Sequence, residues 1–310
     1  MNKKDYLSID IGGTNIKYGL LDRSGKLISK GKVSTKCTDI LSFKQLIDSI
    51  VEPRLSNVRG IAISVPGKVD VHRGVVYYGG SLPYLDGFDF YNYFRKKYNL
   101  QCSVENDGKA AALAELWLGT LKGQNNGIVL VLGTGVGGGI VINRQLYRGV
   151  HFQAGELSFM PTTSDFSTMN NFVGVYDSAV EMIKRIATSL GLADKTDGIA
   201  VFEAIKNGNF VAQKIFKEYC RRIATLILSI EAVLDMDRVV IGGGISAQSV
   251  LIDEINNQIK QLFRKVSLVS ETLILPQVVQ AHFQNDANLY GALYALLQRV
   301  DDANGEISCI

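Results

Sequence analysis

The sequence predicts an α/β protein built from two related halves. Short apolar runs separated by glycine turns predict strands, and longer stretches with apolar residues at helical spacing predict helices between them. A strand, a glycine-rich turn and a strand occur at 6–20 and recur at 128–142. The length of 310 residues is about twice that of a typical domain. We therefore expect two domains, in each of which strands alternate with helices.

The first half is expected to begin with two or three antiparallel strands separated by glycine turns. A helix, two further strands and an alanine- and leucine-rich helix follow. The ranges are 6–35 for the first strands, 40–55 for the helix, 58–65 (ending at Pro66-Gly67) and 101–104 for the later strands, and 109–119 for the second helix.

The second half repeats the strand and glycine-turn scheme and then becomes mostly helical. The last predicted helix comes after the strands and helices that complete the second half, so we expect it to cross back and pack on the first half. The predicted ranges are a polar connector over 162–171, helices over 177–190, 198–207 and 210–234, a strand over 238–241, a glycine turn at 242–244 opening a helix near Ser246, and the last helix over 285–299. We place the domains at 1–118, joined by helix 285–300, and at 119–284.

The composition is that of an ordinary globular protein, with 46% apolar and 20% charged residues. The net charge is 33 − 30 = +3, which is too small to predict a nucleic-acid or anionic-membrane partner. The uncharged stretch 125–143 contains six glycines between β-branched runs, so we interpret it as sheet rather than as a membrane span. The N-terminus does not resemble a signal peptide, and we expect a cytoplasmic protein.

The four cysteines are widely scattered, without a C-x-x-C pair or a histidine at metal-ligand spacing. We interpret them as reduced and mostly structural. The residues are Cys37, Cys102, Cys220 and Cys309.

Three glycine-rich turns each follow a predicted strand, where backbone N–H groups can approach phosphate closely. The first, Asp10–Thr14 with Lys17 beyond it, adds a carboxylate for hydrated Mg²⁺ together with a hydroxyl and an amine for phosphate. The alternative is a hairpin turn with an incidental aspartate.

The other two turns fit a nucleotide in different ways. The turn at 133–139 lacks the Gly-Lys-Ser/Thr of a Walker loop and does not open a long helix, yet it has more glycines than a plain turn needs. The turn at 242–244 precedes a helix and could receive adenosine or its phosphates. A tight strand-to-helix connection is the alternative for this third turn.

The segment Glu105-Asn106-Asp107 is the candidate catalytic station. Asp107 lies at or beside a helix N-cap, where the helix dipole and amide donors favour an ionised carboxylate that could accept a proton. Helix capping alone is the alternative. Glu156 follows a glycine and could accept hydrogen bonds from ligand hydroxyls. The three histidines, His72, His151 and His282, stand in no motif that requires a general base.

Six motifs, taken in order, resemble the ROK family of bacterial sugar kinases and sugar-responsive repressors. They are DIGGT at 10–14, SVPGKVD at 64–70, ENDGKAAALAE at 105–115, GTGVGGGIV at 133–141, AGEL at 154–157 and IGGGIS at 241–246. The family has the actin-like ATPase fold, with two α/β domains flanking a cleft and a final helix that returns to the N-terminal domain.

The resemblance implies roles for particular residues, with ATP as the phosphate donor and a sugar as the acceptor. Asp107 would be the catalytic base, Asn106 and Glu156 would hold sugar hydroxyls, and Gly67 would lie along the sugar site. Asp10 would act through Mg²⁺ by way of water. The cofactor-binding residues would be Gly12, Gly13, Thr14 and Lys17 in the first turn, Gly133, Thr134, Gly135, Gly137 and Gly138 in the second, and Gly243 and Gly244 near the adenosine.

Departures from the family pattern are equally informative. The usual zinc site needs a histidine two residues beyond AGE-Ile/Leu and a C-x-C-G-x-x-G-C run, but here Ser158-Phe159 stands there and no cysteine lies between Cys102 and Cys220. We expect no structural zinc. Many members have Asn-Leu-Pro-Gly-Trp where this chain has 81–85, Ser-Leu-Pro-Tyr-Leu. These changes resemble the zinc-less branch, which includes β-glucoside kinases and some N-acetylmannosamine kinases.

The resemblance therefore implies ATP-dependent phosphorylation of a hexose or hexoside, with the 6-hydroxyl as the expected acceptor, by a homodimer. Two other functions remain open. A sugar-sensing regulator would need an N-terminal helix-turn-helix, whereas this chain enters its first strand by about Tyr6. A non-sugar ATPase of the same fold would not require Asn106, Asp107 or Glu156.

Overall fold

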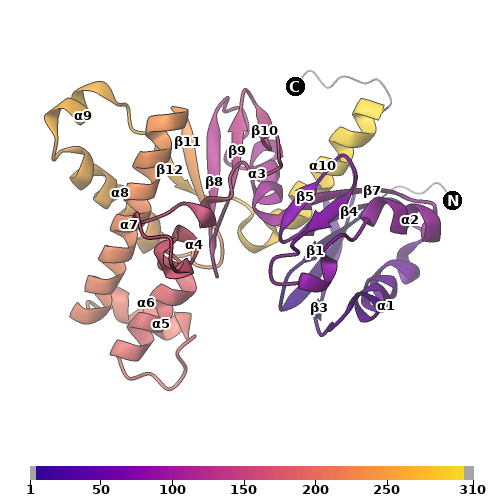
Figure 1. Ribbon diagram of the computed structural model, residues 1–310, viewed down its shortest axis with the longest axis horizontal. Helices are drawn as coiled ribbons and strands as arrows, with labels where there is room; N and C mark the ends of the chain where they lie inside the picture. Colours follow the sequence, from indigo (N-terminus) through magenta and orange to yellow (C-terminus); the bar gives the residue numbers. More distant parts are fainter. Residues whose placement is uncertain (1–4, 304–310) are drawn as a thin grey trace. The chain divides into compact units, whose positions relative to one another are not determined.

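The computed structural model describes residues 5–303, and Cys309 lies outside this range. Within it the chain divides into two compact units. Unit 1 takes residues 5–118, 146–154 and 286–303, and unit 2 takes 119–145 and 155–285. Each unit contains a five-stranded mixed sheet, which confirms the α/β prediction (Figure 1).

The sheet of unit 1 has the strand order β3-β2-β1-β4-β7. The three N-terminal strands are antiparallel, as the glycine turns predicted, and β4 and β7 add in parallel. The strands are β1 (Asp5–Ile11), β2 (Asn15–Leu21), β3 (Leu27–Ser34), β4 (Val58–Val65) and β7 (Gln101–Asn106). A separate hairpin of β5 (Lys68–Asp70) and β6 (Val75–Tyr77) follows β4.

The two faces of this sheet are covered by different helices because side chains alternate along a strand. In β1, Leu7 and Ile9 face a core shared with α1 (Ile40–Val51) and α2 (Phe90–Tyr98). Tyr6 faces the opposite way, into a cluster with α10 (Ala287–Ala303). The last helix thus packs on the first strands of the chain, and it also lies against α3 (Asp107–Trp117) (Figure 1).

The sheet of unit 2 has the order β10-β9-β8-β11-β12. It repeats the pattern of the first sheet: β8 and β9 are antiparallel, and β11 and β12 add to β8 in parallel. The strands are β8 (Gly127–Leu132), β9 (Val136–Ile142), β10 (Gln145–Tyr147), β11 (Arg238–Gly242) and β12 (Gln277–Gln280). The uncharged stretch 125–143 is therefore sheet, as predicted.

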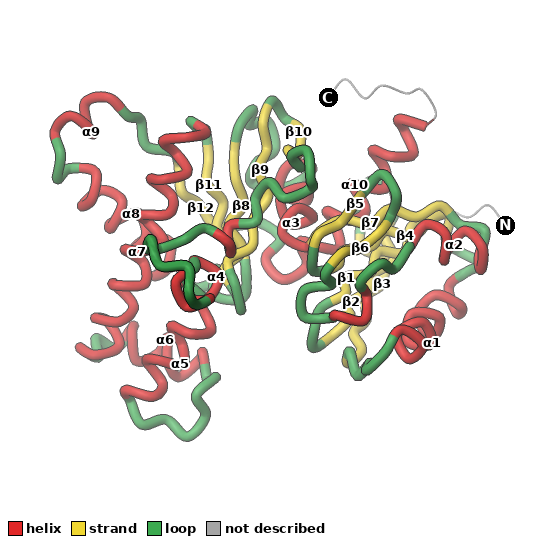
Figure 2. The backbone as a smooth tube through the Cα atoms, in the orientation of Figure 1, coloured by secondary structure: helices red, strands yellow, loops and turns green. Residues whose placement is uncertain are grey.

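Helices of unit 2 pack on this sheet around one large apolar core, and Figure 2 shows them grouped beside its strands. The helices that contribute to this core are α4 (Val173–Tyr176), α5 (Ala179–Ser189), α6 (Gly198–Lys206), α7 (Phe210–Leu234) and α8 (Ser249–Phe263), whereas α9 (Ser267–Thr272) has no buried residue. No helix within residues 5–303 is both long enough and apolar enough to span a bilayer.

One predicted boundary is wrong. The helix after the third glycine turn begins at Ser249 and not near Ser246, because the Ser246 N–H donates to Gly243 O within a turn. Short 3₁₀ turns also occur: Glu52–Arg54, Pro83–Leu85, Leu157–Phe159, Met169–Asn171 and Gln284–Asp286.

Candidate functional site

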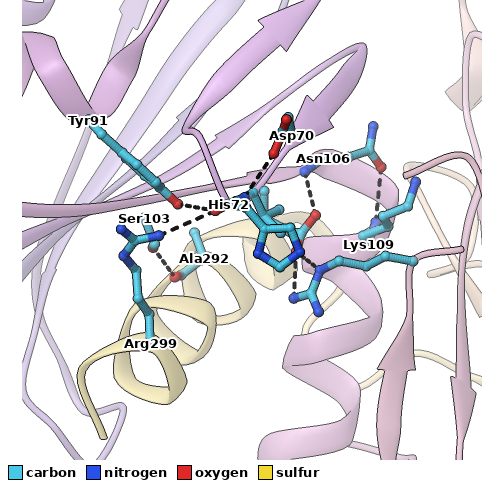
Figure 3. Close-up of polar contacts among 11 residues, drawn as sticks. Asp70, His72, Tyr91, Ser103, Asn106, Lys109, Ala292 and Arg299 are labelled. Carbon is cyan, nitrogen blue, oxygen red and sulfur yellow. Dashed lines mark hydrogen bonds and ion pairs between the residues drawn. The ribbon is translucent and has the colours of Figure 1, made fainter. Parts of the chain in front are cut away.

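Asn106 and Asp107 lie where β7 ends and α3 begins. Asn106 is the N-cap, with extended backbone, and its side chain accepts the N–H of Lys109 at 3.1 Å (Figure 3). Asp107 is the first helical residue, and its Oδ1 accepts the N–H of Gly108 at 2.8 Å. The capping role thus belongs to Asn106. The carboxylate of Asp107 lies in the first turn of α3, at the positive end of the helix dipole.

Gly67 is brought to the same place by the end of β4. The Asn106 Nδ2 donates to Gly67 O at 3.0 Å and to Asp107 Oδ1 at 3.1 Å. Gly67 has φ +94°, and a Cβ there would stand 3.0 Å from Gly79 Cα. Glycine is required at this position because an L side chain would be both strained and crowded. Unit 1 therefore joins Gly67, Asn106 and Asp107 in one hydrogen-bonded group.

Asp10 lies near the end of β1 on the face covered by α10, and it is only 8% exposed. Its Oδ1 accepts the Asn288 Nδ2 at 2.9 Å, and its Oδ2 lies 3.6 Å from the Lys17 Nζ. Burial raises the pKa of Asp10 above its ordinary value, and the contacts with Asn288 and Lys17 oppose that rise. Lys17 is the antiparallel partner of Asp10 in the β1–β2 register.

The turn between β1 and β2 is fixed by backbone contacts. The Gly12 N–H donates to Asn15 O at 3.1 Å, and the Thr35 N–H donates to Thr14 O at 2.9 Å. A Cβ on Gly13 would stand 2.6 Å from Ser81 Oγ. Ser81, the first residue of the segment that departs from the family pattern, thus packs against the glycine turn.

The turn between β8 and β9 in unit 2 is built differently. A Cβ on Gly133 would meet nothing within 4 Å, so the packing of the structure does not require glycine there. The carbonyl of Gly133 accepts the N–H of Ala179 at 3.0 Å, which ties the turn to the start of α5. The Ser158 Oγ lies 3.0 Å from a Cβ placed on Gly135. Thr134 at the tip is exposed, and Gly137 continues into β9.

Glu156 lies in unit 2, half-buried, just before a short 3₁₀ turn. Its loop is held against β9 by two glycines, because a Cβ on Gly155 would stand 2.9 Å from Gly138 O and Gly155 has φ +81°. The loop that carries Glu156 and the strand that leaves the second glycine turn therefore touch through their backbones.

Gly243 and Gly244 follow β11 and differ from each other. Gly243 has φ +93°, and a Cβ there would stand 2.2 Å from Leu132 O. Gly244 has open space on its Cβ side. Close packing of β11 against β8 therefore explains Gly243 and leaves Gly244 available to a ligand.

Other expected features are placed as follows. His72 is exposed and contacts the ring of Phe152, His151 is exposed, and His282 contacts the ring of Phe283. Phe159 is 63% exposed. No group of three His, Cys, Asp or Glu side chains suited to a metal ion occurs within residues 5–303. Cys102 and Cys220 are buried, and Cys37 is partly buried.

Two polar partners of the site were missed from the sequence. Asn288, from α10, contacts Asp10 across 278 residues of chain. Arg148 forms an ion pair with the buried Glu105, with the Nη2 at 2.8 Å from Oε2. The sequence signals were weak: Asn288 is a polar residue at the start of the uncharged stretch 287–297, and Arg148 is an arginine six residues ahead of the AGEL motif.

Known proteins are similar to this chain over most of its length. A β-glucoside kinase from Klebsiella pneumoniae is 30% identical over 247 residues, which cover 77% of this chain and 81% of that protein. A ROK family protein from Streptococcus pneumoniae TIGR4, solved in complex with sucrose, superposes with a TM-score of 0.85 at 30% identity, covering 96% of this chain and 99% of that one.

A ROK family glucokinase from Streptomyces griseus, solved with glucose and AMPPNP, has a TM-score of 0.80 at 25% identity, with 93% and 98% of the two chains covered. These neighbours have the actin-like ATPase fold, and so does this protein. The model of the ROK family matches residues 6–299. With its sequence, its fold and its relatives in agreement, the chain belongs to the ROK family.

Proposed function

We propose that this protein is an ATP-dependent carbohydrate kinase that phosphorylates a hydroxyl of a hexose or hexoside. The observation that carries the proposal is the position of the Asp107 carboxylate at the N-terminus of α3. The Asn106 side chain donates hydrogen bonds to this carboxylate and to Gly67 O. Phosphoryl transfer to an alcohol requires a proton acceptor beside groups that form hydrogen bonds with the ligand. Family membership and the kinase relatives support the same function.

In the proposed reaction the sugar hydroxyl, with the 6-hydroxyl as the expected acceptor, attacks the γ-phosphorus of ATP. The new O–P bond forms as the bond to the leaving ADP oxygen breaks, and Asp107 takes the hydroxyl proton. Positioning supplies most of the catalysis in phosphoryl transfer, and well-oriented reactants can recover about 7–11 kcal/mol of the barrier. The base contributes less, about 10²–10⁴-fold.

We assign nucleotide binding to the glycine turns, namely Gly12, Gly13 and Thr14 in unit 1 and Gly133–Gly138 in unit 2. The open space beside Gly133 and Gly244 supports close approach of a ligand to the backbone. Mg²⁺ would neutralise charge on the phosphates. Both oxygens of Asp10 already have protein neighbours, which suits contact with this ion through water.

We assign sugar recognition to Gly67, Asn106, Asp107 and Glu156. The β-glucoside kinase relative and the sucrose-bound neighbour favour a glucose-type or β-glucoside substrate, with N-acetylmannosamine as a further candidate. Units 1 and 2 would be the two domains of each subunit of a cytoplasmic homodimer. The departures at Ser158-Phe159 support a protein without structural zinc.

The test is a coupled ADP-release screen of glucose, fructose, N-acetylmannosamine, cellobiose and gentiobiose with wild type and Asp107→Ala. We expect one sugar to stimulate turnover strongly. The variant should keep sugar and ATP binding by calorimetry but lose about 10²–10⁴-fold in kcat. Near-normal turnover by the variant would remove Asp107 from the mechanism.

Two other results would redirect the assignment. ATP turnover independent of every sugar would indicate a non-sugar ATPase of the same fold. Sugar binding without turnover in wild type would favour a sugar-sensing protein.

A further inference from the structure

Glu105 is a buried carboxylate directly beside the catalytic station. Its side chain is 1% exposed, so its charge needs partners inside the protein. Each oxygen has a separate one: Oε2 lies 2.8 Å from the Arg148 Nη2 and 2.9 Å from its Nε, and Oε1 accepts the backbone N–H of Asn106 at 3.0 Å. The guanidinium therefore fixes the carboxylate, and the carboxylate fixes the peptide of Asn106.

That peptide determines where the proposed ligand-binding groups point. The Asn106 side chain forms hydrogen bonds with Gly67, Asp107 and Lys109. A rotation of the peptide that carries the Asn106 N–H would disturb all three. Figure 3 shows Asn106 and Lys109 joined at the start of the helix. Glu105 thus holds the first turn of α3 from the strand side.

Arg148 comes from a segment far away in the sequence. The segment 146–154 belongs to unit 1, although the chain on both sides of it belongs to unit 2. Within this segment the Ala154 N–H donates to Arg148 O at 3.1 Å. The ring of Phe152 packs against the ring of His72, with 5.5 Å between the ring centroids. Two residues after the segment ends, the chain reaches Glu156, which we assign to the sugar.

We propose that Arg148 is a positioning residue that acts through Glu105 to hold Asn106 and Asp107 in the geometry for accepting the sugar. This inference rests on the proposed kinase function. Arg148 lies within the segment 146–154 and acts on Asn106 and Asp107, while Glu156, proposed to bind sugar hydroxyls, follows two residues after this segment ends.

The experiment compares Arg148→Met, Arg148→Lys, Glu105→Gln and the double variant Arg148→Met/Glu105→Gln, with Arg264→Met as a matched control. Arg264 is an exposed arginine at the end of α8. We expect Arg148→Met to lower kcat about 10–100-fold, the range for displaced reacting groups, and to raise the sugar KM. The KM for ATP should change less than about threefold. Arg148→Lys should recover part of the loss.

The double variant separates positioning from stability. Removing Arg148 alone leaves a buried, uncompensated carboxylate, whereas removing both charges relieves that cost. We expect the melting temperature of the double variant to lie near that of the wild type. Its kcat should stay at least about tenfold below the wild-type value, because no guanidinium then holds the side chain at position 105 against the Asn106 N–H. Recovery of both melting temperature and kcat would overturn the proposal, as would wild-type kinetics of Arg148→Met.

A readout that needs no activity keeps this inference apart from the proposed function. Hydrogen–deuterium exchange of the amides at 105–109 should be about tenfold faster in Arg148→Met and in the double variant than in Arg264→Met. Unchanged exchange there would overturn the proposal even if the kinase assay succeeds. Faster exchange in a protein that phosphorylates no sugar would support the link from Arg148 to Asn106 and reject the kinase function.

Discussion

The two sheets share one strand order but differ in the chemistry of their first turn. In unit 1, Asp10 faces Lys17 across the hairpin, one pair before Ile11 and Ile16. In unit 2 the corresponding pair is Val131 and Gly137, one pair before Leu132 and Val136. The same scaffold thus carries a buried aspartate paired with a partly exposed lysine in one unit and an uncharged pair in the other.

The two units therefore share the backbone turn, but only the turn of unit 1 has a charged pair of residues beside it. The loop between the paired residues is Gly12–Asn15 in unit 1 and the shorter Gly133–Gly135 in unit 2. Unit 1 also carries Asp107, the proposed proton acceptor. We therefore expect substitutions in unit 1 to affect catalysis, and substitutions in the turns of unit 2 to affect nucleotide affinity or folding.

The largest expected effect comes from removing the charge that makes the turns differ. Asp10→Ala should lower kcat/KM for ATP about 100-fold, because Mg²⁺ would lose the carboxylate that we propose holds it through water, and with it the cation that offsets phosphate charge. Val131→Ala, at the corresponding position, should leave kcat/KM within about threefold of wild type. Steady-state kinetics at varied ATP and Mg²⁺ measure both. Equal losses in the two variants would contradict the assigned division of roles.

Next in size is a backbone effect in unit 2. Gly243→Ala should destabilise the protein by about 1–3 kcal/mol, because its φ of +93° strains a side chain and its Cβ would meet Leu132 O. Gly244→Ala, with open space, should change stability by less than about 0.5 kcal/mol. Urea unfolding of both variants gives the comparison, and a harmless Gly243→Ala would refute the packing explanation.

A smaller effect is expected at the second glycine turn. Gly133→Ala should fold normally, because a Cβ there meets nothing within 4 Å. Its affinity for an ATP analogue should fall about tenfold, or roughly 1.4 kcal/mol, if phosphate approaches this backbone. Calorimetry with AMPPNP measures the loss. Unchanged affinity would separate this turn from the nucleotide.

The smallest effect concerns the pH dependence of stability at Asp10. Burial raises its pKa above the ordinary 3.8, so the folded state holds this proton more tightly than the unfolded state. The stability that this provides is complete below pH 3.8 and is lost as pH rises through the folded-state pKa. Asp10→Asn should therefore melt higher than wild type at pH 7, with an advantage that shrinks in acid. An advantage that grows in acid would reverse the assigned direction.

Local pattern was sufficient for much of the fold. The strand Val58–Val65 and the helix Phe210–Leu234 have the predicted bounds, because apolar spacing and flanking turn residues define both ends. The hairpin of β5 and β6 was missed because its strands have three residues each, too few for a periodic signal. The helix α2 was missed although Asp89 caps it, because its apolar residues are mostly aromatic.

The candidate site divides in the same way. Asn106 and Asp107 could be predicted because capping chemistry and a helix start are local signals. Lys17 was predicted only as an amine for phosphate, and its pairing with Asp10 appears in the β1–β2 register of the structure. Neither Asn288 nor Arg148 could be placed, since their partners lie 278 and 43 residues away and depend on how α10 and the segment 146–154 dock.

The return of α10 to the first strands has a consequence for biosynthesis. The Ser8 hydroxyl donates to Leu289 O across 281 residues, and Tyr6 and Ala62 are covered by the same helix. A nascent chain leaves the ribosome from its N-terminus, so the first sheet emerges early, and the apolar face that α10 covers stays exposed until α10 has been translated. Unit 2 can fold in the meantime. A ribosome that stalls before α10 would release a chain whose first sheet, although synthesised first, still lacks the helix that covers one of its faces.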